Sequence, residues 1–274
     1  MRSEVLILKV ADAGSYFVRN TVTIGKPPLA IAADALGGEN IEALLMPSRY
    51  TSDMSNEDAI LEADALHVPY HMISVEPIFK AFLHSLEPVF KDAPPTVWDT
   101  TEENIQARSR GVLLMALSNR KGKMLLTTGN KSEMAVGYAT LYGDMAGGYA
   151  VLKDVSKILV YRLSEYRNSV SPVIPRRVID RPPSADLRAD QKDSDSLPDY
   201  AILDAILEMY IEQDKCLNDI VSAGYEEETV RKVIKMVNQN EYKRRQAAPG
   251  IRITKRAFGR DRRYPITSGF IRKH

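Results

Sequence analysis

The stretch KMLLTTGNKSEMAVGYATLYGDM, residues 123–145, decides the fold class of this chain. An apolar run at residues 124–126 ends in the polar turn TTGN, residues 127–130, and a helix-forming segment follows from Lys131. This order of strand, tight turn and helix is typical of parallel α/β sheets, where ligands bind outside the carboxyl ends of the strands. Because a helix N-terminus offers free N–H groups to an anion, the turn is a candidate binding site.

Three side chains are candidates for the mouth of this site. Thr128 lies in the turn, Glu133 lies in the first turn of the helix, and Asp144 follows eleven residues beyond Glu133. A hydroxyl and two carboxylates suit Mg²⁺ and a nucleotide. The alternative, a capped helix with solvated acids, also fits this spacing.

Composition narrows the class of protein. The 274 residues suffice for one large α/β domain or two small ones. The net charge of +1 gives no bulk argument for nucleic-acid binding, and no apolar run approaches the ~18 residues of a membrane span. The single cysteine, Cys216, excludes an intrachain disulfide, fits a reducing cytoplasmic location, and is expected in the core. The four histidines show no metal-ligand spacing.

A family resemblance rests on the longer string LLTTGNKSEMAVGYATLYGDMAGGYAVLKDV, residues 125–155. This string closely resembles the core of NAD⁺ synthetase, an ATP-pyrophosphatase-type amidoligase, and is nearest to the glutamine-dependent form. The resemblance runs from about Ala32 to Ile266. It implies an α/β fold, a parallel twisted sheet with helices on both faces, Rossmann-like and of the adenine nucleotide alpha-hydrolase kind. We expect an atypical N-terminal segment at 1–28 and a synthetase domain at 29–274.

The N-terminal segment departs from the family pattern. The family carries a Ser-Gly-Gly-x-Asp-Ser loop before its alanine-rich helix, where backbone amides wrap the ATP pyrophosphate and the Asp helps to hold Mg²⁺. Counted back from residues 33–37, those six positions fall on 20–25, NTVTIG, and none matches the motif. Gly25 and Lys26 remain as a weak candidate anion site. The departure leaves the ancestry intact and puts catalysis in doubt.

The resemblance assigns ATP to Thr128, Lys157, Ser184 and Met46. Independently of it, a lysine in the first turn of a helix opposes the helix dipole, so Lys157 suggests an anionic partner, with an exposed lysine as the alternative. Met46 ends an apolar strand at 41–47, where adenine lining and plain core are equal interpretations.

The second substrate implied by the resemblance is deamido-NAD⁺. Its residues would be Asn104, Arg108, Glu133, Asp144 and Lys243, and Glu133 would also be the metal ligand. Composition alone predicts that the polar residues on the first turns of helix 100–122, which include Arg110, are solvated surface. By resemblance, this whole helix lies at a homodimer interface.

Three further segments carry predictions. Residues 87–99 contain three prolines and indicate a linker-like loop. Residues 171–199, rich in proline and charge, match the family's lid loop over the active site. The tail 243–274 holds eleven Lys or Arg residues against one acid, a pattern that suggests RNA or a membrane surface. Against both stand the near-zero net charge and the few aromatics, so we predict neither nucleic acid nor membrane as a partner.

The implied reaction belongs to NAD biosynthesis. The nicotinate carboxylate of deamido-NAD⁺ attacks the α-phosphate of ATP, and ammonia then attacks the acyl-adenylate, giving NAD⁺ and AMP. The chain would be a cytoplasmic, homodimeric carbon–nitrogen ligase with Mg²⁺ and ATP. Ammonia is expected as the direct nitrogen donor, either free or from a separate glutamine amidase. No general base for ammonia is identifiable. The alternative is an inactive or truncated relative that keeps the fold and deamido-NAD⁺ binding or dimerisation.

Overall fold

Parallel strands form the centre of the protein in the computed structural model, which describes residues 5–7, 27–93, 95–96, 99–181 and 196–267. The described strands are β1 (Val5–Ile7), β2 (Ala43–Leu45), β3 (Tyr70–Met72), β4 (Met124–Thr127) and β5 (Tyr149–Ala150). They form a three-stranded sheet in the order β1-β4-β5 and a pair β2-β3. All of these pairings are parallel, with Val5 opposite Met124 and Leu126 opposite Tyr149. The predicted parallel α/β class is confirmed.

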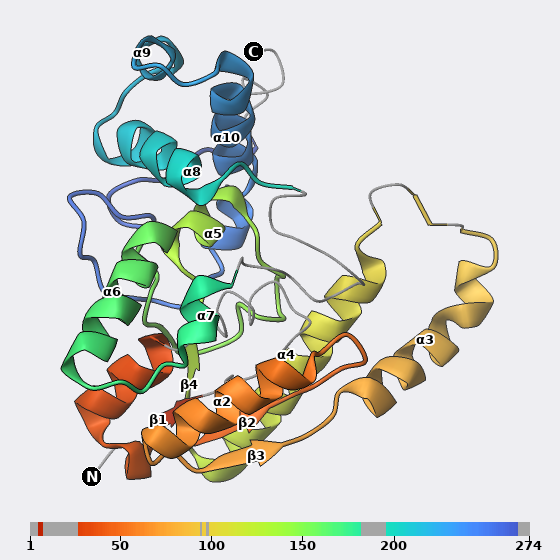
Figure 1. The fold of residues 1–274 in the computed structure, drawn as a ribbon. Helices are drawn as coiled ribbons and strands as arrows, with labels where there is room; N and C mark the ends of the chain where they lie inside the picture. Colours follow the sequence, from red (N-terminus) through yellow and green to blue (C-terminus); the bar gives the residue numbers. More distant parts are fainter. Residues whose placement is uncertain (1–4, 8–26, 94, 97–98, 182–195, 268–274) are drawn as a thin grey trace.

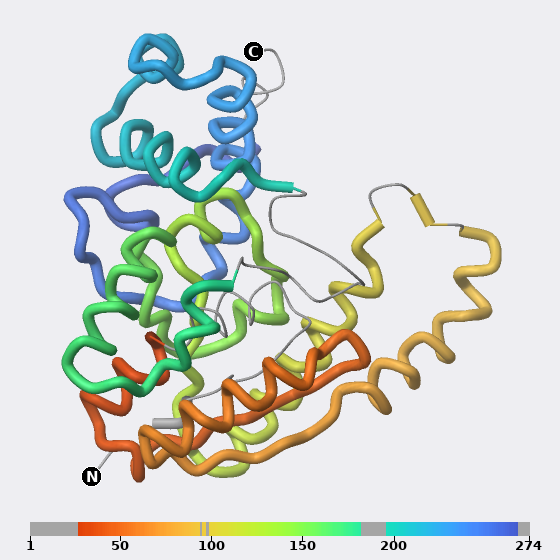
Figure 2. The backbone as a smooth tube through the Cα atoms, viewed as in Figure 1, coloured from red at the N-terminus to blue at the C-terminus, as the bar shows by residue number. Residues whose placement is uncertain are grey.

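Helices surround these strands (Figure 1). The described ones are a helix at 27–36, a short 3₁₀ turn Gly38–Asn40, α2 (Asp53–Ala65), α3 (Glu76–Phe90), α4 (Thr101–Lys121), α5 (Lys131–Val136), α6 (Lys157–Val170), α7 (Arg176–Asp180), α8 (Tyr200–Leu207), a π-helical turn Glu208–Glu212, α9 (Leu217–Ser222), α10 (Glu227–Gln239) and α11 (Glu241–Arg244). Figure 2 shows that α3 lies at the outer edge of the molecule, far from α9 and α10.

Strand residues alternate between two apolar clusters, as a sheet buried on both faces requires. Leu45 and Leu126 pack in one cluster with residues of α2 and of the helix at 27–36. Leu44 and Leu125, each one position away, pack in another cluster with Leu114 of α4. Helices therefore cover the strands from both sides. A third cluster joins α5 to α8, α9 and α10 and forms the C-terminal part of the core.

Two predictions about segments are wrong. The linker expected at 87–99 begins later, because α3 continues through Pro88 to Phe90 and Lys91 N–H still donates to Glu87 O at 3.3 Å. Cys216 is exposed and lies at the N-terminal cap of α9, not in the core. The preceding helical turn ends at Glu212 and Asp214 has a φ of +55°, so Cys216 lies in the connection between two helices and not on an apolar helix face.

The lid loop expected at 171–199 is only partly described. It contains the short helix α7, and residues 182–195 lie outside the described part. Of the helices that the structure describes, none combines the length and apolar character that crossing a bilayer would require.

Candidate functional site

The predicted site turn follows β4 directly, and local sequence explains the helix after it. Asn130 caps α5 by accepting from Glu133 N–H at 3.0 Å, while the Glu133 carboxylate accepts from Asn130 N–H at 3.2 Å. This reciprocal arrangement satisfies two N–H groups that a helix start leaves unpaired. Gly137, with φ +72°, ends the helix in the left-handed region that glycine tolerates. The predicted strand, turn and helix are confirmed.

The carboxyl end of α5 is held by side chains from the C-terminal helices. Asn240 donates to Val136 O at 2.9 Å, and Arg244 donates to Ala135 O at 2.7 Å. Lys243 Nζ donates to the carbonyls of Gly137 and Ala139, each at 2.8 Å. Cationic donors at a helix C-terminus satisfy unpaired carbonyls and oppose the negative end of the dipole. This six-residue helix is thus fixed at both ends.

Helix α4 approaches the following turn closely enough to exclude side chains. A Cβ added at Gly111 would lie 2.9 Å from the carbonyl oxygens of Tyr142 and Gly143. A Cβ added at Gly143 would lie 2.9 Å from the backbone carbonyl carbon of Ala107. Contact this close requires glycine on both sides. It places the first turns of α4, with Asn104 and Arg108, against the turn that follows α5.

Four of the predicted deamido-NAD⁺ residues gather at that turn. Asp144 accepts from Thr140 N–H at 2.7 Å, and the Thr140 hydroxyl donates to Asn104 Oδ1 at 2.9 Å. Arg108 Nε donates to Leu141 O at 3.3 Å. With Lys243 of α11 bonded to Gly137 and Ala139, residues 137–144 are held by side chains from two helices, α4 and α11.

Electrostatic interactions connect Lys243 with Asp144 and Arg108. Burial lowers the pKa of the Lys243 ammonium, the nearby negative charge of Asp144 opposes this, and the positive charge of Arg108 adds to it. A partly desolvated ammonium that faces both an acid and a guanidinium suits an anionic ligand. The charges of Lys243, Asp144 and Arg108 therefore influence one another at this turn.

Glu133 and Lys157 form a second, deeper group. Both side chains are fully buried, and Lys157 Nζ lies 3.5 Å from Glu133 Oε1. The ammonium also lies 4.6 Å from the ring centroid of Tyr200, in cation–π geometry. Glu133 therefore supplies the anionic partner that the position of Lys157 in the first turn of α6 predicts. A buried pair of this kind needs such added contacts, because desolvation opposes it.

Sequence reasoning missed Asp204, which caps α6 from 46 residues away. Its carboxylate accepts from Ile158 N–H at 2.8 Å, and Ser132 donates to it. Burial raises the pKa of Asp204, although these hydrogen bonds oppose the rise. Lys157 N–H donates to Ser132 Oγ at 2.9 Å, so the first N–H groups of α6 are already engaged. No local pattern around residue 204 signals this role.

The remaining predicted residues lie apart from these two groups or outside the described part. Thr128 is buried at the end of β4. Met46 is fully buried in the core cluster with Leu44 and Leu125, and its carbonyl accepts from Arg110 Nε at 3.3 Å. Arg110, expected as solvated surface, is itself completely buried, which corrects that prediction. Ser184 and positions 20–26 lie outside the described residues.

The oxygen ligands for Mg²⁺ are few in the described part of the chain. There, no group of three or more His, Cys, Asp or Glu side chains could hold a metal ion. Glu133 is a hard oxygen ligand, but its carboxylate is committed to Asn130 and Lys157. The residues fit Mg²⁺ only as a partial site, since this ion commonly takes one or two carboxylates and completes its shell with substrate phosphates and water.

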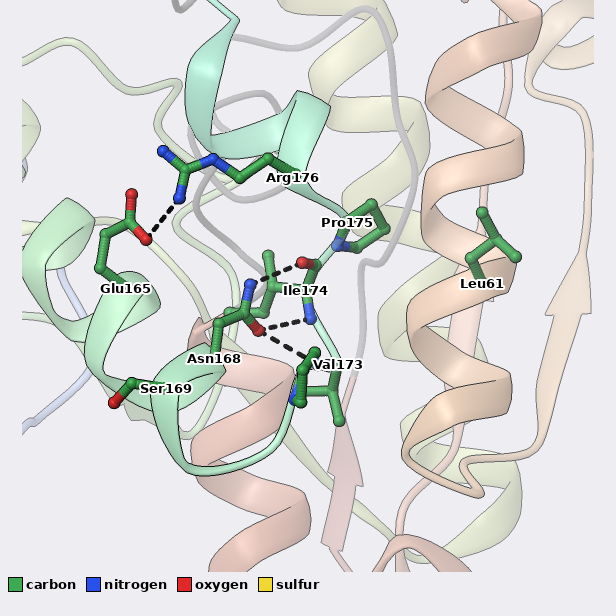
Figure 3. Close-up of a pocket in the computed structure, with 9 residues that line it drawn as sticks. Leu61, Glu165, Asn168, Ser169, Val173, Ile174, Pro175 and Arg176 are labelled. Carbon is green, nitrogen blue, oxygen red and sulfur yellow. Dashed lines mark hydrogen bonds and ion pairs between the residues drawn. The ribbon is translucent and has the colours of Figure 1, made fainter.

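Two cavities differ in their position relative to the predicted site residues, and only the smaller lies beside them. One of about 580 Å³, between α2 and the α6–α7 connection, contains none of the predicted site residues (Figure 3). There Asn168 fixes the connection by accepting from Ile174 N–H at 2.9 Å and donating to Ile174 O at 2.7 Å. The other, of about 10 Å³, lies beside the site turn and is lined by Gly129, Met134 and Met145 among others. It has room for one water-sized molecule.

Comparison with known proteins decides the family. The family model described as NAD synthase matches residues 29–247. The chain belongs to the NAD synthase family. The glutamine-dependent NAD(+) synthetase of Acinetobacter baylyi is 57% identical over 244 residues, which are 88% of this chain and 44% of that protein. This member of the NAD synthase family thus spans less than half the length of that curated relative.

Solved structures agree with the fold of this NAD synthase family member. The glutamine-dependent NAD⁺ synthetase from Acinetobacter baumannii, solved in complex with adenosine diphosphate, has a TM-score of 0.60 and 48% identity, over 98% of this chain and 47% of that one. The NH3-dependent NAD synthetase from Campylobacter jejuni has a TM-score of 0.64 at 22% identity, over 89% and 87%. The second likeness concerns the fold alone.

Proposed function

We propose that this chain catalyses ATP-dependent amidation of deamido-NAD⁺ to NAD⁺ through an acyl-adenylate, with ammonia as the direct nitrogen donor. The observation that carries the proposal is the gathering of Asn104, Arg108, Asp144 and Lys243 around residues 137–144. This cluster directly follows α5, whose Glu133 pairs with Lys157. Membership in the NAD synthase family supports it.

Glu133 and Lys157 act on the phosphates of ATP in this proposal. The carboxylate oxygen of deamido-NAD⁺ forms a bond to the α-phosphorus of ATP, and the bond to pyrophosphate breaks. Negative charge then grows on the phosphates, and the Lys157 ammonium stabilises it in a site of low dielectric. In this proposal Thr128 positions the nucleotide, Met46 is apolar lining for the adenine, and Ser184 contacts ATP. Glu133 would hold Mg²⁺, which when bound supplies further charge stabilisation at the phosphates.

The residues around the turn at 137–144 bind deamido-NAD⁺ in this proposal. Lys243 and Arg108 are cationic and meet its phosphates or carboxylate, while Asn104 and Asp144 offer hydrogen bonds to hydroxyl and amide groups. Because Lys243, Arg108, Asn104 and Asp144 already hydrogen-bond to the turn or to each other's partners, the substrate binds to a preformed surface. Much of the barrier between two nucleotides is removed by such positioning.

Ammonia enters the second step. Its nitrogen forms a bond to the acyl carbon, the bond to AMP breaks, and the amide remains after loss of a proton. The void of about 10 Å³ beside Gly129 is too small and too apolar to identify the nitrogen donor, so the choice of ammonia rests on the experiment below. A separate glutamine amidase is the alternative source, because the A. baylyi relative is named glutamine-dependent and extends well beyond the matched region.

The test is NAD⁺ formation from deamido-NAD⁺, Mg²⁺-ATP and ammonium chloride, with a glutamine-only control. We expect product with ammonium and none with glutamine alone. Absence of product under both conditions, in protein that is folded by circular dichroism, would overturn the proposal.

One observation favours a second candidate, a folded but inactive relative. Positions 20–25 lack the Ser-Gly-Gly-x-Asp-Ser motif, so ATP would lose several charge-assisted hydrogen bonds at about 1.5–3 kcal/mol each. This candidate expects deamido-NAD⁺ binding without turnover, together with weak ATP binding. Normal ATP affinity by titration calorimetry would exclude it.

Homodimer formation is part of the proposal. Apolar side chains on α3 and α4 are exposed, among them Phe82 (45%), Val89 (67%) and Val112 (65%), and these two helices pack side by side. Exposed apolar residues on adjacent helices commonly mark a protein interface. Light scattering after size exclusion would show twice the chain mass.

A further inference from the structure

A third cavity, with a polar lining, lies away from the residues assigned to ATP and deamido-NAD⁺. It has a volume of about 670 Å³ and forms between the loop at 153–154 and the tail segments 249–252 and 257–263. None of the site residues predicted from the sequence lines it. Its size lies within the range of small-molecule binding sites, roughly 300–1,000 Å³.

The floor of this tail cavity is rigid. Ala150 N–H donates to Pro249 O at 2.7 Å, and a Cβ added at Gly250 would lie 2.4 Å from Ala150 O. Asp154 accepts from the N–H groups of Ile253 and Thr254 at 2.8 and 2.7 Å. Residues 248–254 of the tail are therefore bonded to the loop before α6.

The rim of the tail cavity is a turn anchored at both ends. Phe258 and Tyr264 are buried in the C-terminal core cluster, and the Arg244 guanidinium lies 4.5 Å from the Phe258 ring centroid. Between them Gly259 has φ +105°, and its N–H donates to Arg262 O at 3.0 Å. This geometry presents Arg260 and Arg263 from a fixed backbone, which lowers the ordering cost of binding.

Positive charge dominates the lining. Lys153, Arg252, Arg260 and Arg263 face two acids, Asp154 and Asp261. Both acids are engaged already: Asp154 pairs with Lys131 at 2.8 Å, and Asp261 accepts from Arg252 at 3.0 Å. The surplus charge therefore lies on the other cations.

Lys153, Arg260 and Arg263 carry that surplus; Arg263 is exposed and its Nε donates to the carbonyl of Gly259. Lys153 Nζ donates to Ala248 O at 2.5 Å and, among the described residues, pairs with no carboxylate. Burial lowers the pKa of its ammonium, so an anion beside it would relieve an unfavourable charge. Arg260 is exposed and makes no hydrogen bond within the described part of the chain.

We propose that the tail cavity is a binding site for a diphosphate-bearing small molecule, held by Lys153, Arg260 and Arg263. Arginine fits phosphate oxygens with two parallel hydrogen bonds, and lysine adds a point charge at the floor. The inference stands independently of the proposed synthetase activity, because it uses none of the residues assigned to that activity.

The test is titration calorimetry of the full chain with inorganic pyrophosphate at constant ionic strength. We expect Arg260→Gln to raise Kd at least tenfold, and Arg260→Gln combined with Arg263→Gln to raise it further. The matched control is Lys232→Gln, which removes one exposed charge on α10. Inorganic phosphate and succinate replace pyrophosphate in parallel titrations, and we expect weaker binding of phosphate and none of the dicarboxylate.

Lys153→Met separates binding from folding. Because the variant removes a partly buried ammonium, we expect an unchanged or raised Tm together with weaker pyrophosphate binding. The proposal fails if the wild-type chain does not bind pyrophosphate, or if binding survives in the double arginine variant, as it would at the ATP site alone. It also fails if Lys232→Gln weakens binding as much as Arg260→Gln, or if succinate binds equally well.

Discussion

Glu42 gives a prediction whose size follows from its surroundings. It is buried just before β2, and its carboxylate accepts from Lys121, from Lys123 at 2.9 Å, and pairs with His71 Nε2 at 2.6 Å. Burial alone would raise the pKa of Glu42, but the hydrogen bonds from Lys121, Lys123 and His71 outweigh it and lower the pKa from 4.5 to about 2. The charged carboxylate is therefore favoured by folding.

The magnitude and its sign follow by linkage. A folded pKa of about 2 against 4.5 corresponds to about 3 kcal/mol of stability. Because the folded pKa is the lower one, this stability is present above pH ~4.5 and is lost as the pH falls toward ~2. We expect Glu42→Gln to be less stable than the wild type at pH 7 and to approach it near pH 2.

The assay is urea unfolding of both chains at a series of pH values between 2 and 7. Other acids titrate in both proteins, so the difference between the two free energies of unfolding isolates Glu42. Glu39→Gln, at an exposed acid three residues earlier, is the control. A wild-type minus Glu42→Gln difference that stays constant across this range would refute the reasoning.

Three further predictions concern the proposed site and interface. Lys243→Met should raise the KM for deamido-NAD⁺ more than that for ATP, measured by steady-state kinetics, because Lys243 lies with Arg108 and Asp144. Gly143→Ala should lower stability by about 1–3 kcal/mol in urea unfolding, because its Cβ would meet Ala107; equal stability would contradict the close packing. Val112→Asp should convert a dimer to a monomer in light scattering, because it charges an exposed apolar face of α4.

The strand, turn and helix around residues 124–136 could be predicted because their signals are local. The apolar run, the Asn130 cap and Glu133 three residues later lie within one short window. The cluster at residues 137–144 could be predicted only from the family resemblance. Composition alone predicts that Asn104 and Arg108 are solvent-exposed surface residues. Local windows contain no information about which distant helix faces them.

The misses at Arg110 and Asp204 share that cause. Arg110 is buried, and its Nε donates a hydrogen bond to the carbonyl of Met46, 64 residues away. No charge pattern in the sequence around Arg110 indicates this partner. Asp204 caps a helix that begins 47 positions earlier in the chain. Cys216 differs, because it lies in a local break between two helices, where Asp214 has a positive φ. Tertiary contacts and isolated backbone breaks override residue-type preferences.

The double anchoring of α5 has a consequence for the order in which the protein assembles during synthesis. A six-residue helix is too short to persist alone in water, and its carboxyl end depends on Asn240, Lys243 and Arg244. The ribosome must therefore release about a hundred further residues after α5 before that end is secured. The turn at residues 137–144 is therefore completed only after residues 240–244 have left the ribosome.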